Sequence, residues 1–317
     1  MCITLQQVQQ AAETHLPGRT VQAVEPLGSW IRQNYRIVLD GGQIVFLKVD
    51  NYANLDGLTE KEAFIVTLLQ SHDLPAPRVL AVDTTCSVIA YPYLIQEQIT
   101  GMRLDRLLGQ VEKVEACKVF EAVGRFYRRL HAVHHDRSGY IMGAGEVLPH
   151  SPNDYMHRQV IVELGREAVE RGILAADVYE QLVQVSAHHL DYLKAHTPTL
   201  IGGGLLWTIA LDRDASGQWQ VVRLMDLPDM LYWDPAFDLA FLRYPPYMDL
   251  DPALWQAFLV GYGHVPEDKR LMLYRLIQCV DAALGNYEAP PDLFDPAWVQ
   301  RVSHTLLGAL RDIEALP

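Results

Sequence analysis

The chain has 317 residues, of which 50% are apolar, enough to bury a large core in one domain or two lobes. Its formal net charge of −13 argues against nucleic acid as a partner, because phosphate backbones are bound by basic surfaces. The four cysteines form no CxxC pair and indicate neither a zinc site nor a disulfide framework, which favours a reducing cytoplasm. No secretory signal pattern opens the chain, and no apolar run reaches the roughly 18 residues of a spanning helix, so no membrane partner is expected.

The first hundred residues predict a small sheet with one helix. Strands are expected over "VQAVEPLG" and over both halves of "NYRIVLDGGQIVFLKVD", where Asp40-Gly41-Gly42 has the composition of a hairpin turn. A helix follows in "LTEKEAFIVTLLQSHDLPAPRVL", and "RVLAVD" and "VIAYPYLIQEQI" predict two more strands. The order over residues 20–100 is therefore β-β-β-α-β-β.

From residue 104 onward the pattern becomes helical. "VEKVEACKVFEAVGRFYRRLHAVH" places an apolar stripe on one helical face, and "SPNDYMHRQVIVELGREAVERG" and "AADVYEQLVQVSAHHLDYLKAH" predict further helices. A hairpin interrupts them near 200–226, and the rest is mostly helical. The prediction is an α+β protein with a β-rich N-lobe (1–100) and a larger, mainly helical C-lobe (101–317) that carries the hairpin.

Lys48 stands inside the apolar strand "IVFLKVD". A buried lysine is costly unless it is paired or used, so it either points to solvent at a strand edge or has a function. Glu62, near the start of the next helix, could pair with it; alternatively, Glu62 completes a capping box with Thr59. A strand lysine followed by a helix glutamate is the order that aligns nucleotide phosphates in kinases.

Asp226 ends an apolar strand in "LMDLPDMLYWDPAFDLAFL", where a carboxylate is well placed to hold Mg²⁺. The alternative is a turn or cap aspartate, as expected for Asp234 before proline. The pairs His131 with His134 and His188 with His189 could bind metal, but capping or helix-surface histidines explain them more simply.

These segments, in this order, resemble the aminoglycoside phosphotransferase and choline kinase-like group from about residue 20 to 285. The resemblance implies a bilobal, protein-kinase-like fold with a small antiparallel-sheet N-lobe. It further implies ATP or another nucleotide with Mg²⁺ on Asp226, a small-molecule substrate, and a nucleotide site built from Gly28, Ser29, Lys48, Glu62 and the hinge backbone of Glu97 and Ile99.

The group's catalytic loop reads His-Gly-Asp, four residues, then Asn. The matching stretch here is "GGGLLWTI", so Gly202 replaces the histidine, Gly204 the catalytic aspartate and Ile209 the metal-binding asparagine. Losing such a base costs roughly 10²–10⁴ in rate. Asp212 and Asp214 lie beyond the following strand and are too distant to substitute; Asp154 in the helical region remains a candidate.

We therefore expect a nucleotide-binding protein that has lost its catalytic residues, a pseudokinase-like member of the group. The alternative is an active ATP-dependent phosphotransferase with a relocated base, acting on a hydroxyl of a small molecule, cationic molecules included. A third alternative is a structural protein that binds no nucleotide.

Overall fold

The computed structural model describes residues 3–27, 32–50, 57–143, 145–150, 154–189, 191, 193, 196–202, 208–225, 227–245, 248–287 and 296–314. Contacts divide the chain into two units. Unit 1 comprises Met1–Gln110, Ile141–Glu146 and Trp207–Met230; unit 2 comprises Val111–Tyr140, Val147–Leu206 and Leu231–Pro317. The units are interleaved along the chain, whereas the expected lobes are contiguous, and the lobe boundary near residue 100 stays a prediction.

Unit 1 contains a five-stranded antiparallel sheet in the order β1-β2-β3-β5-β4. Its strands are β1 (Val21–Leu27), β2 (Gln33–Leu39), β3 (Ile44–Val49), β4 (Val79–Asp83) and β5 (Tyr93–Glu97). The β2–β3 turn is Asp40–Gly42, in which Gly41 and Gly42 take positive φ values of 73° and 79° that favour glycine. The predicted hairpin and the order β-β-β-α-β-β are confirmed.

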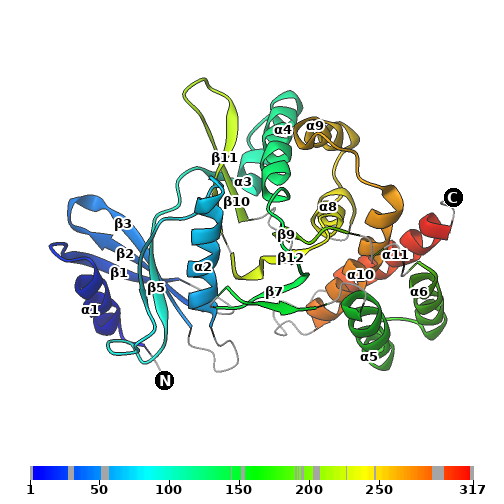
Figure 1. Ribbon diagram of the computed structural model, residues 1–317, viewed down its shortest axis with the longest axis horizontal. Coiled ribbons are helices and arrows are strands. Elements are labelled where there is room, and N and C mark those ends of the chain that lie inside the picture. Colours follow the sequence, from blue (N-terminus) through cyan, green and yellow to red (C-terminus); the bar gives the residue numbers. More distant parts are fainter. Residues whose placement is uncertain are drawn as a thin grey trace. The chain divides into compact units, whose positions relative to one another are not determined.

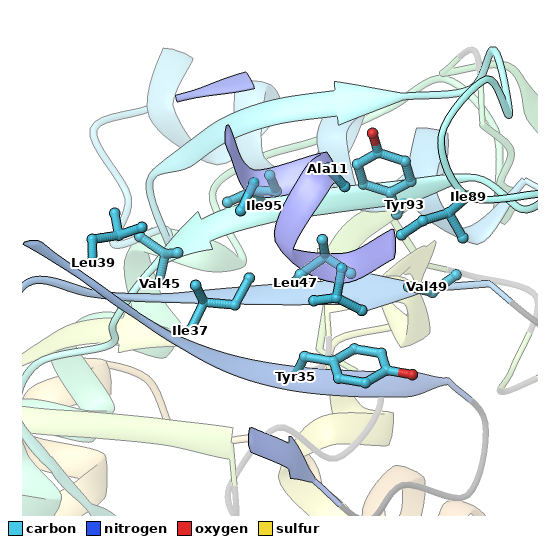
Figure 2. Packing of buried hydrophobic residues seen from close by; sticks show 12 residues of the cluster. Ala11, Tyr35, Ile37, Leu39, Val45, Leu47, Val49, Ile89, Tyr93 and Ile95 are labelled. Atoms are coloured by element: carbon cyan, nitrogen blue, oxygen red, sulfur yellow. The ribbon is translucent and has the colours of Figure 1, made fainter. Parts of the chain in front are cut away.

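One face of this sheet is covered by helix α1 (Leu5–His15), which the sequence prediction of a single helix in this region missed. Small side chains of α1, Ala11 and Ala12 among them, lie on the aliphatic side chains that alternate along β2 and β3 (Figure 2). Thr4 and Gln7 form a capping box at the helix start, and this signal was available in the sequence.

A buried polar cluster joins the end of α1 to the sheet. The Tyr93 hydroxyl donates to Asp83 Oδ2 at 2.8 Å, and His15 Nε2 lies 3.2 Å from the same oxygen. Burial alone would raise the pKa of Asp83, but hydrogen bonds from Thr85 and Tyr93 lower this pKa to about 2. Burial and the Asp83 carboxylate raise the pKa of the Tyr93 phenol.

Helix α2 (Leu58–Ser71) lies against strands β4 and β5 of the same unit (Figure 1). The predicted capping box of Thr59 with Glu62 is wrong, because the N-cap is Gly57 in the left-handed conformation and Thr59 is already inside the helix. The Thr59 amide instead donates to Asp50 Oδ2 at 2.7 Å. Asp50, at the end of β3, thus caps α2 from a neighbouring element.

The predicted hairpin near 200–226 is also observed. It consists of β10 (Ile209–Arg213) and β11 (Trp219–Leu224), and with β6 (Met102–Arg103) it forms a three-stranded sheet in the order β11-β10-β6. The short elements α3 (Leu104–Leu108) and η4 (Leu227–Asp229) complete the named elements of unit 1.

Unit 2 is mainly helical. Its helices are α4 (Lys113–Leu130), the π-helical η2 (Asp154–Leu164), α5 (Gly165–Glu170), α6 (Ala176–His188), α8 (Ala236–Arg243), α9 (Pro252–Tyr262), α10 (Asp268–Tyr287) and α11 (Pro296–Glu314). A small sheet has the order β8-β7-β12-β9, with β7 (Gly139–Ile141), β8 (Val147–Pro149), β9 (Thr199–Ile201) and β12 (Leu231–Trp233).

Helices α4 and α9 lie side by side in unit 2 (Figure 1). Their backbones meet at two glycines: a Cβ on Gly124 would lie 2.1 Å from the Phe258 carbonyl oxygen, and one on Gly261 would lie 2.0 Å from that of Glu121. Only glycine permits so close an approach. Among the described helices of both units, none is long and apolar enough to cross a membrane.

Candidate functional site

The structure brings Lys48 and Glu62 together. Lys48 extends from the face of β3 that carries Phe46, opposite to the aliphatic face beneath α1, and its Nζ donates to Glu62 Oε1 at 2.7 Å. The Glu62 side chain is fully buried and that of Lys48 is 15% exposed. The alternative of a solvent-facing lysine is therefore wrong.

Two further residues, which the sequence interpretation missed, complete a buried network around this pair. Arg32 Nη1 contacts the second carboxylate oxygen of Glu62, and Arg32 Nε lies 2.8 Å from Asp50 Oδ1. The side chains of Arg32 and Asp50 are 8% and 4% exposed. The described members of the network are thus two cations and two anions.

The strand register explains how Arg32 and Asp50 meet. Residues 33 and 34 of β2 pair with 49 and 48 of β3, so continuing the register by one step places Arg32 opposite Asp50. Because side chains two residues apart share a face, both lie on the face of Lys48. The Asp40-Gly41-Gly42 turn, which sets this register, was the sequence signal that could have identified Arg32 and Asp50.

The electrostatics of Glu62 follow from this environment. Burial alone would raise the pKa of the Glu62 carboxyl, but the charges and hydrogen bonds of Lys48 and Arg32 outweigh burial and hold this pKa below its usual value. Glu62 is therefore an anion at neutral pH and keeps both cations in place.

A cavity of about 760 Å³ lies in unit 1. Phe46 of β3 contributes to its wall, one side-chain repeat (about 7 Å) before Lys48 on the same face. The other described lining residues come from the segment after β5 and from the β10–β11 hairpin: Ile99, Gly101, Met102, Arg103, Arg106, Gln110, Ala210, Leu211, Asp212, Trp219 and Met225. Its wall combines apolar and polar groups, as small-molecule sites commonly do.

The expected hinge residues lie at this cavity or next to it. Ile99 lines the wall. Glu97 ends β5, and its amide donates to the Arg78 carbonyl at 2.9 Å. A base contact from Glu97 would therefore come from its carbonyl oxygen.

In unit 2, the start of the glycine-rich segment is held by a buried aspartate. The Gly202 amide donates to Asp238 Oδ2 at 2.7 Å. His131, the C-cap of α4, lies between that oxygen and the Tyr262 hydroxyl, at 3.3 Å and 3.0 Å. The interpretation of His131 as a capping residue is confirmed, and the supporting role of Asp238 was missed.

A comparison of the sequence with family models identifies the family of the chain. A family model described as "Phosphotransferase enzyme family" matches residues 23–274, most of the chain. The chain belongs to this phosphotransferase family.

Solved structures agree on the fold. An aminoglycoside 2'-phosphotransferase-IIIa mutant in complex with GDP matches with a TM-score of 0.71 and 16% identity, over 98% of this chain and 99% of that one. The GDP and kanamycin complex of APH(2")-IIIa gives 0.69 and 16%, over 96% and 98%. A Thermobifida fusca protein assigned as a fructosamine-3-kinase gives 0.67 and 22%, over 97% and 100%.

These likenesses establish the bilobal, protein-kinase-like α+β fold of the phosphotransferase family. Among curated proteins, no match was found.

The phosphotransferase family's catalytic segment is only partly described. Gly202, at the expected histidine position, is buried, and Ile209, at the expected asparagine position, is fully buried in β10 opposite Leu224. Gly204, at the expected aspartate position, lies outside the described residues, as do Gly28, Ser29 and Asp226.

Metal binding finds no support within the described ranges. There, no group of three or more His, Cys, Asp or Glu side chains could hold a metal ion. The predicted place of Asp212 beyond the strand is wrong, because Asp212 lies within β10. Asp214 accepts hydrogen bonds from Ser216 and Gln218 in the β10–β11 turn, where the sequence placed it.

Proposed function

We propose that the protein binds a nucleotide in unit 1 and is a phosphotransferase-family member with little or no phosphoryl transfer. The observation that carries the proposal is the Lys48–Glu62 ion pair, which is buried, short and charged although the family's catalytic side chains are absent from the sequence. A lysine held in this way is suited to bind phosphate oxygens.

The cavity beside Phe46 supports the assignment of the base. Its wall combines apolar side chains such as Leu211 with Ile99, whose backbone follows β5 as a hinge does. A base in this cavity would place its phosphates toward Lys48, because Phe46 and Lys48 follow one another on one face of β3. Similar structures hold GDP, ADP or ATP, and a purine nucleoside di- or triphosphate is the ligand that we infer for the present chain.

The loss of transfer follows from the substituted positions. Glycine at 204 has no group to accept the proton of an attacking hydroxyl, which removes roughly 10²–10⁴ in rate. Ile209 offers no oxygen to a metal. If one Mg²⁺ is bound, Asp226 would be its carboxylate ligand, and Asp226→Asn should then weaken the Mg²⁺ dependence of ATP binding.

Calorimetry with ADP and with ATP in the presence and absence of Mg²⁺ tests binding. The wild type should bind, and Lys48→Met should bind ADP at least about tenfold more weakly because a phosphate contact is lost. No heat or thermal shift with ADP, ATP, GDP or GTP would refute the nucleotide site.

Turnover is measured separately against the compounds named in similar structures: kanamycin, gentamicin, streptomycin, hygromycin B and a fructosamine. We expect no phosphorylated product above background. Efficient transfer to any of them would instead establish the alternative, an active phosphotransferase with a relocated base.

Restoration distinguishes a lost base from a wider defect. The variant Gly202→His, Gly204→Asp, Ile209→Asn should gain transfer if the remaining groups are in place. Because Ile209→Asn buries an amide in β10, the melting temperature of the triple variant must be measured as well. A well-folded triple variant without activity would mean that the catalytic loss extends beyond these positions.

A further inference from the structure

Among the residues that the structure describes, the formal charges of the network around Glu62 cancel. Arg32 and Lys48 are cations, Asp50 and Glu62 are anions, and all four side chains are at least 85% buried. The Lys48–Glu62 pair alone would also be neutral, so neutrality by itself does not require Arg32 and Asp50. This chain nevertheless has this second pair, directly opposed across the strands, beside the pair proposed to face the phosphates.

We propose that Arg32 is a positioning residue that sets the charge at the phosphate end of the nucleotide site. It neutralises Asp50 and shares Glu62 with Lys48, so that the positive charge of Lys48 remains available to an anion. This inference rests on the proposed nucleotide site.

The division of the Glu62 carboxylate supports this role. Oε1 accepts from Lys48 and Oε2 contacts Arg32, so each cation has its own oxygen. When Lys48 turns toward a phosphate, Glu62 stays paired with Arg32. Without Arg32, one buried cation would face two buried carboxylates, and the site would repel an anionic ligand.

The presence of Asp50 at this place also has a reason. Its Oδ2 caps α2 through the Thr59 amide, which fixes the helix that carries Glu62. A carboxylate so near the phosphates would by itself weaken anion binding. Arg32 cancels that charge and leaves the cap intact.

The test compares the affinity for ADP with that for adenosine, which lacks phosphates. Arg32→Met keeps much of the side-chain volume but removes the charge, and should weaken ADP binding about tenfold while leaving adenosine binding unchanged. Adding Asp50→Asn restores neutrality and keeps an oxygen for Thr59, so the double variant should regain ADP affinity to within about threefold.

Arg19→Met is the matched control. Arg19 precedes β1, where its Nε lies 2.8 Å from Asp40 Oδ1 of the β2–β3 turn in a partly exposed pair, and its loss changes the net charge of the protein equally. It should leave both affinities unchanged. A general effect of protein charge would instead weaken ADP binding in both arginine variants.

Equal ADP affinity in the wild type and a folded Arg32→Met variant would overturn the role of Arg32 and leave the nucleotide site standing. If the wild type binds none of ADP, ATP, GDP and GTP, both the nucleotide site and the role of Arg32 are overturned. If Arg32→Met does not fold, Asp50→Asn alone decides: it leaves a surplus positive charge and should tighten ADP binding several-fold over adenosine. Unchanged ADP binding in that variant would refute the inference.

Discussion

Replacing Glu62 with glutamine should destabilise unit 1 strongly. The Glu62 side chain is fully buried between Lys48 and Arg32, which are themselves almost fully buried. Glutamine preserves the shape but removes the charge, so that Asp50 is the one anion of the described network left to balance two cations. Uncompensated buried charge is among the largest single-residue penalties known in folded proteins.

The magnitude follows from the burial. Removing one partner of a buried ion pair costs about 3–5 kcal/mol, and glutamine still offers one oxygen, which favours the lower end. At roughly 2–4 °C per kcal/mol for a chain of this size class, the melting temperature should fall by about 6–12 °C. By contrast, Glu25→Gln removes an exposed pair with Arg36 and should cost less than about 1 kcal/mol.

Thermal melts followed by circular dichroism at neutral and acidic pH provide the assay. Because the pKa of Glu62 is lowered in the folded state, its stabilisation is present above the unfolded value and is lost as the pH falls through the lowered pKa. The gap between wild type and Glu62→Gln should therefore close in acid. A Glu62→Gln protein that melts within about 2 °C of wild type at pH 7 would refute this reasoning.

Three further outcomes are expected. Gly124→Ala, where a Cβ would meet the backbone of α9 at 2.1 Å, should lower the melting temperature by at least about 5 °C, whereas Gly308→Ala, with open space in α11, should raise the melting temperature slightly. Similar shifts in both variants would contradict the close α4–α9 contact. Asp238→Ala removes the acceptor of the Gly202 amide, so hydrogen exchange at that amide should accelerate at least about tenfold, and unchanged protection would count against the bond. Asp83 has a pKa lowered to about 2, so the wild type should have a larger free energy of unfolding than Asp83→Asn, by up to about 2 kcal/mol above pH 4, and this difference should vanish as the pH falls through 2. A pH-independent difference would contradict this.

Much of the fold could be predicted from the sequence because its signals are local. Alternating side chains and the Asp40-Gly41-Gly42 turn predict the β2–β3 hairpin, and the strand-helix order predicts that Lys48 meets Glu62. These features depend on residues close in sequence or on one helix packing onto one sheet.

Other features depend on contacts that a linear pattern does not reveal. Thr59 with Glu62 has the spacing of a capping box, yet Glu62 forms ion pairs with Arg32 and Lys48. The start of the helix is instead capped by Asp50, at the end of β3. Asp238 has the appearance of a helix-cap residue, but it holds the Gly202 amide from a distant part of the chain. Tertiary partners decided the role of each carboxylate.

The direct opposition of Arg32 and Asp50 has a consequence for how this lineage can change. Substituting either residue alone leaves an uncompensated charge in a buried position, whereas exchanging both for uncharged residues keeps the interior neutral. The two positions should therefore vary together among related sequences, as a pair separated in the chain but joined across one rung of the sheet. Covariation of positions 32 and 50 among related sequences would be evidence of this electrostatic constraint.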